Sequence, residues 1–571
     1  MDKKTAMAFG LIVLVIILLP YYYQLVLPPP ETAPPDSGLV EQVAADSFPS
    51  SVPAIITEKP EVAPEDQPQE MQPTAGDFPW EDTPQFVTVE TPLCQLTFSS
   101  QGGVLVGCRL LEYEGQDEGK VQLIRPGSKE NLNLVIYRNG ALLDMRQVRF
   151  IPDQREIFIP REGQATLAFR AEDPGGGWVK KQFFFRGDRY PFEMRIESEG
   201  IDNLDPYYEV HWGSGLAITE ADTIQDISYA KAYAYMGGEQ EKFSGKGDKD
   251  LSGQASGQTE WVAQRNKYFE VVILPLSRPA RGVLFGMDAQ PMLGRHQPKV
   301  YRMALNMSGQ LSEETGVFTV YCGPIDQDLL AQVHPKLEGT MDWGFVVIEP
   351  FSKLVLWSLK ILHKVIPNYG LVLIVFSILV KIVVWPLTHK STRAMTRMSA
   401  LQPKIKELQE KYKANPERLN KATMQLYKEE GVNPFSGCWP TLLQMPLLYA
   451  LFIVFRSTIE LRGAPFILWI KDLSMPDIIA LLPFSIPFYG SHIAMLPIFM
   501  GITQLLMSRV MITDPKQKAT MYMMPIFMVL IFNNFPSGLS LYYALFNLWT
   551  YLQQTLLKRQ GVIPATKPSR P

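Results

Sequence analysis

Residues 370–387 read GLVLIVFSILVKIVVWPL, an apolar run with a single formal charge at Lys381. A helix needs about 20 such residues to cross the hydrocarbon core of a bilayer. Similar runs follow, so the sequence predicts membrane-spanning helices over 370–389, 439–456, 492–511, 521–535 and 538–557. The alternative is that these runs are buried helices of a soluble domain. Five such runs so close together make this alternative unfavourable.

The first 27 residues contain another apolar segment, which begins after Lys3 and Lys4. A cleaved signal peptide would end in small residues, whereas tyrosines at 21–23 and prolines at 28–30 occupy this position. We therefore predict an uncleaved transmembrane anchor over 1–27, with a signal peptide as the alternative.

Charge is distributed unevenly along the 571 residues, although the formal net charge is only −4. Residues 28–84 hold twelve acidic residues and one lysine, whereas 390–438 hold ten basic and five acidic residues. Cytoplasmic loops of membrane proteins are enriched in Lys and Arg. Six spans place 390–438, the 512–520 loop and the 558–571 tail together on the cytoplasmic side with both termini. The acidic segment and the 457–491 loop then lie on the opposite, periplasmic side.

The segments outside the predicted spans differ in composition and in polarity pattern. Thirteen prolines and few apolar residues predict a disordered, acidic linker over 28–84. Short runs of alternating polarity with glycine-containing turns predict a large periplasmic antiparallel β super-sandwich over 85–335. Within it, the glycine- and serine-rich 237–257 segment predicts a mobile surface loop. We expect a connector over 336–369 whose helix, 351–366, lies amphipathically at the membrane surface, with a packed domain helix as the alternative.

The basic 390–438 segment predicts a cytoplasmic helical hairpin. Leu401, Ile405 and Leu408 keep helical spacing in its first half. Asn415 is a suitable N-cap for the second helix, because Pro416 follows at the first helical position.

Lys381 is the candidate functional residue, because a lysine in a membrane span is costly and normally has a role. It either extends its ammonium group towards the basic side of the membrane or faces a wet cavity inside the helical bundle. Other polar residues in the predicted spans support the cavity: Ser377, Gln444, Gln504, Ser540, Tyr542, Tyr543 and Asn547. The spans contain no acidic partner for Lys381. The four cysteines lack a zinc-binding spacing, and we predict no catalytic residue, cofactor or metal.

A series of motifs in the second half resembles the YidC membrane-protein insertase family of the Gram-negative bacterial type. They are Leu401-Gln-Pro-Lys-Ile405, Val432-Asn-Pro434, Gly437-Cys-Trp-Pro440, Gln444-Met-Pro446 and Phe535-Pro-Ser-Gly-Leu539. Upstream, Trp261-Val-Ala263 and Tyr321-x-Gly-Pro324 resemble the periplasmic domain of the same family.

The resemblance implies a non-enzymatic insertase and chaperone of the inner membrane. Its five-helix core would surround a hydrophilic groove that is open to cytoplasm and lipid, with Lys381 at the position of the family's arginine. Lysine keeps the charge but loses the two-pronged geometry of arginine. The implied partners are nascent membrane-protein chains, the ribosome (through the hairpin and basic tail), the Sec translocon and the lipid bilayer. Substrate helices would slide along Met445, Leu448 and Leu451.

Two other functions fit the sequence less well. An ion or solute transporter is the main alternative, since a charge within a helical bundle is also typical of transport, but internal repeats and paired ionisable residues are missing from the sequence. A membrane-anchored carbohydrate-active enzyme would need paired carboxylates, which the sequence does not identify.

Overall fold

The computed structural model describes residues 83–116, 119–125, 127–243, 251–289, 299–413, 415–431, 439–486, 489–511 and 518–559. The predicted anchor over 1–27, most of the 28–84 linker and most of the 558–571 tail lie outside these described residues, as do 512–517 of the predicted 512–520 loop.

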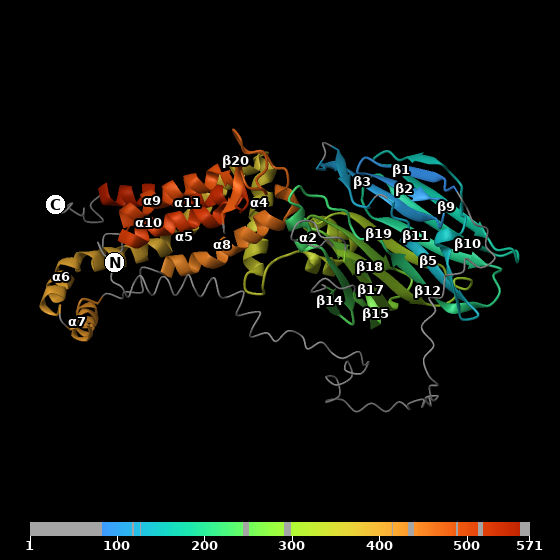
Figure 1. Cartoon of the computed structure of the whole chain (residues 1–571), viewed down its shortest axis with the longest axis horizontal. Coiled ribbons are helices and arrows are strands. Elements are labelled where there is room, and N and C mark those ends of the chain that lie inside the picture. Colours follow the sequence, from blue (N-terminus) through green and yellow to red (C-terminus); the bar gives the residue numbers. More distant parts are fainter. Residues whose placement is uncertain are drawn as a thin grey trace, which may run out of the picture. The chain divides into compact units, whose positions relative to one another are not determined.

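A large β domain comes first in the described chain (Figure 1). Its strands are linked into one extensively paired sheet system, in which β1 and β8 form the parallel pair and the other recorded pairs are antiparallel. The strands are β1 (Phe86–Glu90), β2 (Cys94–Ser99), β3 (Val104–Glu114), β4 (Lys120–Gln122), β5 (Asn131–Arg138), β6 (Ala141–Asp144), β7 (Ile151–Pro152), β8 (Glu156–Phe158), β9 (Gln164–Glu172), β10 (Trp178–Arg186), β11 (Phe192–Glu199), β12 (Leu204–Trp212), β13 (Lys231–Met236), β14 (Glu239–Phe243), β15 (Leu251–Arg265), β16 (Phe269–Pro275), β17 (Ala280–Ala289), β18 (Lys299–Ser308) and β19 (Gly316–Pro324).

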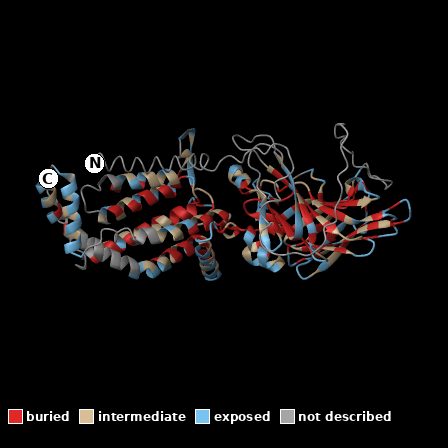
Figure 2. Ribbon diagram, turned by 90° about the horizontal axis from the view of Figure 1, so that it is seen from below, coloured by how far each residue is buried: buried red, intermediate tan, exposed pale blue. Residues whose placement is uncertain are grey.

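Alternation along the strands builds the core of this domain (Figure 2). In β10 every second side chain is buried, as expected for a strand with one face on the core. Phe183 of β10 meets Phe98 of β2 with ring centroids 4.6 Å apart. The prediction of a large antiparallel β domain followed by a helical region is thus confirmed.

The predicted surface loop over 237–257 is wrong in part. Strand β14 occupies 239–243, and β15 begins at Leu251. Ser252 and Gly253 of β15 pair with Gly286 and Phe285 of β17. The glycine- and serine-rich composition hides this strand, because main-chain pairing with a distant segment supplies the order that side-chain pattern does not.

The helical region follows the β domain. Its elements are α4 (Glu349–Val365), α5 (Tyr369–Ala400), α6 (Gln402–Lys411), α7 (Pro416–Glu429), α8 (Trp439–Ser457), the 3₁₀ turn η4 (Ile459–Leu461), the small hairpin β20 (Ile478–Ile486) and β21 (Gly490–Ala494), α9 (Met495–Met511), α10 (Lys518–Phe532) and α11 (Ser537–Arg559). The β domain also carries α2 (Thr223–Tyr229), α3 (Gln327–Val333) and the 3₁₀ turns η1 (Met145–Gln147) and η2 (Pro335–Thr340).

Helix α5 is longer than the predicted span, because it continues through Pro386 to Ala400. The first part of the predicted 390–438 hairpin is therefore the end of α5. Among the described helices, the stretch Tyr369–Pro386 is by itself long and apolar enough to cross a membrane. Gln444–Ser457, Met495–Val510 and Met521–Phe532 are shorter apolar helices.

Helix α4 presents apolar side chains on two faces rather than the one predicted. Val355, Leu356 and Leu359 are buried, whereas Leu354 and Trp357 are exposed. Its lysines form ion pairs: Lys353 with Glu338 and Glu349, and Lys360 with Asp326 and Glu460. The buried face anchors α4 to the protein, and its interfacial position stays a prediction.

Candidate functional site: a buried lysine beside a polar helix face

Lys381 lies on α5 and points into the contact between α5 and α11. Its side chain is buried, and its Nζ donates a hydrogen bond of 2.8 Å to Thr550 Oγ1. The ammonium group also lies 4.8 Å from the centre of the Phe546 ring. Of the two interpretations of Lys381, this geometry favours the inward-facing one, since an ammonium group extended to the membrane surface would be exposed.

Ser377, one turn before Lys381, makes a second contact with α11. Its hydroxyl donates to the Ile374 carbonyl at 2.7 Å and accepts a bond of 3.0 Å from Trp549 Nε1. Trp549 and Thr550 were not identified from the sequence. The spacing of Ser540, Tyr543, Asn547 and Thr550 is helical, so extending this stripe by one more turn would have found Thr550.

Four of the predicted site residues are buried polar side chains on α11 and the adjoining α9, which pack side by side. Gln504, Ser540, Tyr542 and Asn547 are each at most 5% exposed. Among the described residues, Gln504 Oε1, Ser540 Oγ, Tyr542 Oη and Asn547 Nδ2 have no hydrogen-bond partner, and neither polar atom of Gln553 has one. An unpaired buried polar group costs about 1–3 kcal/mol. These groups therefore need water or a polar guest.

The other predicted residues are placed differently. Tyr543 and Gln444 are half-buried. On α8, Met445 is 55% exposed, Leu448 is half-buried, and Leu451 is fully buried in the hydrophobic core. Of the three predicted slide residues, Leu451 is therefore out of reach of lipid or substrate in this conformation.

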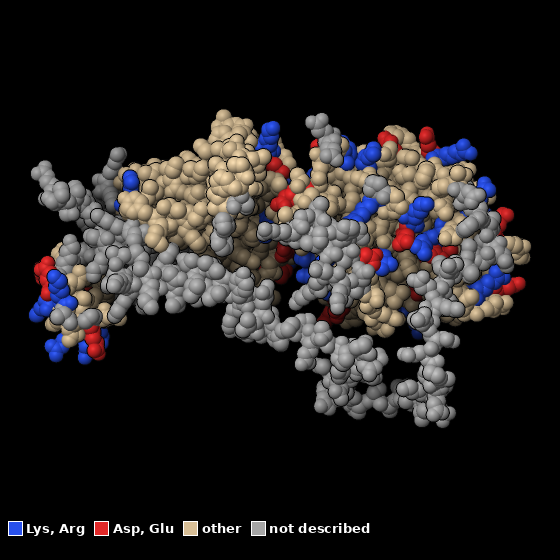
Figure 3. Space-filling view, viewed as in Figure 1, with Lys and Arg blue, Asp and Glu red and all other residues tan. Residues whose placement is uncertain are grey.

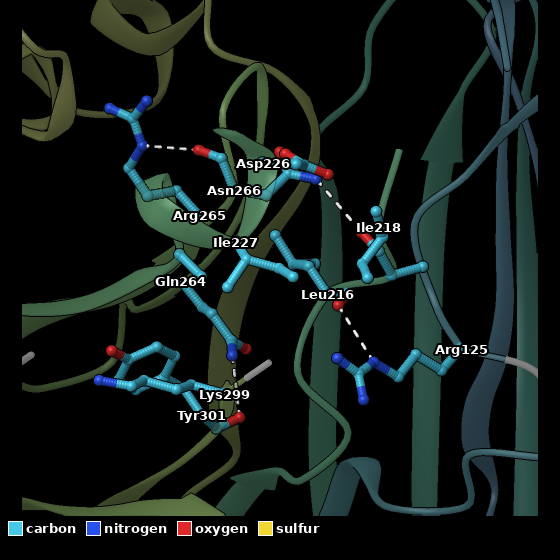
Figure 4. Close-up of a pocket in the computed structure, with 12 residues that line it drawn as sticks. Arg125, Leu216, Ile218, Asp226, Ile227, Gln264, Arg265, Asn266, Lys299 and Tyr301 are labelled. Atoms are coloured by element: carbon cyan, nitrogen blue, oxygen red, sulfur yellow. Dashed lines mark hydrogen bonds between the residues drawn. The ribbon is translucent and has the colours of Figure 1, made fainter. Parts of the chain in front are cut away.

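The β domain contains a small cavity lined by both polar and apolar residues (Figure 4). Its side chains bond to the main chain: Arg125 Nε to the Leu216 carbonyl at 3.3 Å, Gln264 Nε2 to the Tyr301 carbonyl at 2.8 Å, and Arg265 Nε to the Asn266 carbonyl at 2.9 Å. Its volume of about 20 Å³ holds about one water molecule. These hydrogen bonds stabilise the main chain around the cavity, which is too small to be a substrate site.

Comparison with known proteins gives a consistent result for both parts of the chain. Residues 86–357 match the family model described as the YidC periplasmic domain, and 361–563 match the 60Kd inner membrane protein family. The membrane protein insertase YidC of Chlorobaculum parvum is 34% identical over 98% of this chain and 94% of its own length. Its counterpart in Chlorobium luteolum is 34% identical over 93% of this chain and 92% of its own length.

A solved structure described as an active YidC insertase with its first transmembrane domain resolved is 19% identical, covers 86% of this chain and 96% of its own, and has a TM-score of 0.35. The sequence relatives decide the assignment, since a third of the residues are identical along almost the whole length of both proteins. The chain belongs to the YidC family of membrane protein insertases.

Proposed function

We propose that this chain inserts membrane proteins by receiving the hydrophilic part of an incoming polypeptide beside Lys381, in a hydrated groove lined by α11 and α9. The observation that carries this proposal is the set of buried polar atoms without described partners on these two helices, together with the buried cation that bonds to α11. Water in the groove satisfies these atoms when the groove is empty, and polar groups of the substrate replace that water during insertion.

Lys381 supplies the attraction. Its three N–H donors have one hydrogen bond to the described residues, to Thr550, and no carboxylate among those residues pairs with it. A carboxylate of the substrate at 4 Å would interact with it by about 4 kcal/mol at an effective dielectric constant of 20. The groove thereby offsets part of the cost of taking a short acidic tail out of water.

The hydrophobic segment of the substrate then moves into lipid. Met445 and Leu448 on α8 provide the accessible part of the apolar path, and Leu451 joins it only if α8 shifts. Transfer of apolar surface from water to hydrocarbon drives the step, and no covalent chemistry is required.

We propose the six-span topology for the same protein, with both termini cytoplasmic and the β domain periplasmic. On the face that Figure 3 shows, the uncovered part of the helical region carries few charged side chains, whereas the β domain and the α6–α7 hairpin carry many. This contrast supports lipid around the helices and water around the other parts. The short apolar α9 and α10 need flanking residues or local thinning of the bilayer to cross it.

The α6–α7 hairpin is proposed to contact the ribosome, together with the basic tail. The predicted cap is confirmed, since Asn415 Oδ1 accepts a 3.1 Å bond from the Arg418 amide. The buried seam of the hairpin consists of Leu401 and Ile405, with Leu426 and Tyr427 packed against them. A hairpin with so small a core and a net positive charge fits capture of an anionic partner better than support of the bundle. Work beside the Sec translocon is part of the same proposal.

Reconstitution of the purified full-length protein in liposomes tests the function. A small single-span substrate with an acidic outer tail should become protected from protease in these vesicles and stay accessible in empty ones. The transporter alternative, which the named relatives do not favour, is tested on the same vesicles by ion and solute flux. Flux without substrate protection would reject the insertase proposal.

A further inference from the structure

The β20–β21 hairpin, between α8 and α9, exposes an apolar surface that the insertase function does not use. Its strands pair with each other and with no other described strand. Leu481 is 78% exposed and Phe484 61% exposed. Consecutive Ala480 and Leu481 pair regularly with Ile493 and His492, and both are exposed although successive strand residues point to opposite faces, so both faces of β20 are open. A two-stranded hairpin with so little packing is marginal in water.

Strand β21 is nevertheless firmly held, from the turn that precedes it to its last residue. Asn533, which is fully buried, donates through Nδ2 to the carbonyls of Tyr489 and His492 at 2.8 Å each and accepts from the Ala494 amide at 3.0 Å. Asp477 Oδ2 accepts a hydrogen bond of 3.0 Å from Trp469 Nε1 and one of 2.8 Å from the Leu496 amide. These bonds fix the direction of the strands, and Figure 1 shows β20 running across the axes of α9 and α11 rather than along them.

The residue composition of this surface indicates what kind of partner contacts it. No Asp, Glu, Lys or Arg lies between Asp477 and Arg509. The hairpin runs directly into α9, on which Met495, Phe499 and Ile502 are exposed. A protein partner would cover one face and commonly meet a polar rim. An uncharged surface that is apolar on both faces and continuous with an apolar helix instead fits lipid.

We propose that the β20–β21 hairpin lies in the outer leaflet of the bilayer, at the boundary between head groups and acyl chains, and contacts lipid with both faces. The depth follows from the backbone, because the outer edges of a two-stranded sheet leave N–H and C=O groups that hydrocarbon cannot satisfy and interfacial water can. Phe484 and the nearby Trp469 are side chains that favour this level. The outer location of the hairpin rests on the topology under the proposed function.

A fluorescent label at position 481 tests the contact in the full-length protein. Cys438→Ser leaves three cysteines, Cys94, Cys108 and Cys322, which are buried, so Leu481→Cys provides an accessible thiol for an NBD label. Phe158→Cys is the matched control, since Phe158 is 74% exposed on a strand of the β domain. In phosphatidylcholine–phosphatidylglycerol vesicles, the label at 481 should show blue-shifted emission. Bromine near the top of the acyl chains should quench it more than bromine near the bilayer centre.

The label at 158 should show neither effect. Equal emission from the two positions, without bromine quenching, would overturn the proposal. Shielding at 481 that depends on protein concentration but not on bromine would also overturn it, because a second copy of the chain would then be the occupant.

The same vesicles separate this proposal from the insertase mechanism. Lys381→Ala should slow insertion of the acidic substrate roughly tenfold and keep bromine quenching at 481. Quenching without insertion by the otherwise unchanged protein would reject the proposed function and leave the hairpin contact standing. Insertion without quenching would reject the hairpin contact alone.

Discussion

Two buried lysines, one in the β domain and one in the helical region, differ in how their ammonium groups are bonded. Lys181 of β10 is fully buried, and its Nζ donates to the carbonyls of Gly102 and Leu132 at 2.8 and 3.0 Å, with Gly103 at 3.4 Å. Lys381 of α5 is almost as buried and has one bond to the described residues, to the Thr550 hydroxyl. The first lysine completes a set of main-chain acceptors, whereas the second keeps donors available.

The surroundings of the two lysines differ as well. Arg265 in the β domain is buried and donates to the carbonyls of Asn266 and Lys267 at 2.9 Å each, and also to that of Thr340. Unpartnered polar atoms occur in the β domain too, at Trp212 Nε1, Glu270 Oε1 and Lys267 Nζ, whereas those of α9 and α11 belong to predicted site residues and to Gln553. A buried side chain whose hydrogen bonds are satisfied stabilises a fold, and one with unsatisfied polar atoms is suited to receive a guest.

Replacing each lysine should separate their two roles most clearly through the free energy of unfolding. Lys181→Met leaves two well-bonded carbonyls without a donor and should lower the free energy of unfolding by about 3 kcal/mol. Lys381→Met should change it by less than about 1 kcal/mol, because Thr550 keeps its own bond to the Phe546 carbonyl. Thermal unfolding of the full-length protein in detergent measures both. Equal losses would show that Lys381 is structural.

A pH series sharpens the comparison in the β domain. Burial lowers the pKa of Lys181 to about 7, although Asp144 favours its charged form. The unfolded chain therefore binds more protons than the native protein between pH 7 and about 10.5, so the free energy of unfolding should rise across this window, by on the order of 3 kcal/mol. Lys181→Met should lack this rise when unfolding is followed by denaturant titration at each pH. An unchanged slope in this variant would contradict the assignment.

Charge at position 381 should matter for activity. Lys381→Ala is expected to slow insertion of a substrate with an acidic tail roughly tenfold, which corresponds to about 1.4 kcal/mol, and Lys381→Glu should slow it further. Lys381→Arg should retain insertion because the charge remains. A substrate with an uncharged tail is the control and should be affected little. Equal rates for all variants in the liposome assay would remove Lys381 from the mechanism.

The smallest expected effect concerns Thr550. Thr550→Val removes the hydroxyl that orients Lys381 and should slow insertion roughly two- to threefold, in line with the loss of about 0.5 kcal/mol of a hydrogen bond. Thr550→Ser keeps the hydroxyl and should restore the rate. If both variants behave alike, the bond to Lys381 has no part in substrate capture.

Local patterns alone determined much of this protein. The apolar run around Lys381, the Asn415–Pro416 helix start and the strand alternation of β10 depend on neighbours along the chain, and each could be read from the sequence. The ordered motifs likewise identified the family. These features were predictable because helix and strand periodicities and caps are set within a few residues.

The tertiary structure decided which of these residues meet. Lys381 and Thr550 are 169 positions apart, and their bond depends on how α5 packs against α11. Distant segments also meet in three other places: in the burial of Leu451, in the pairing of the glycine-rich β15 with β17, and in the hydrogen bonds from Asn533 to the β20–β21 hairpin. Sequence periodicity gives the face of each element but not its partner. Long-range packing chooses the partner, and with it which polar groups are satisfied and which remain free for a substrate.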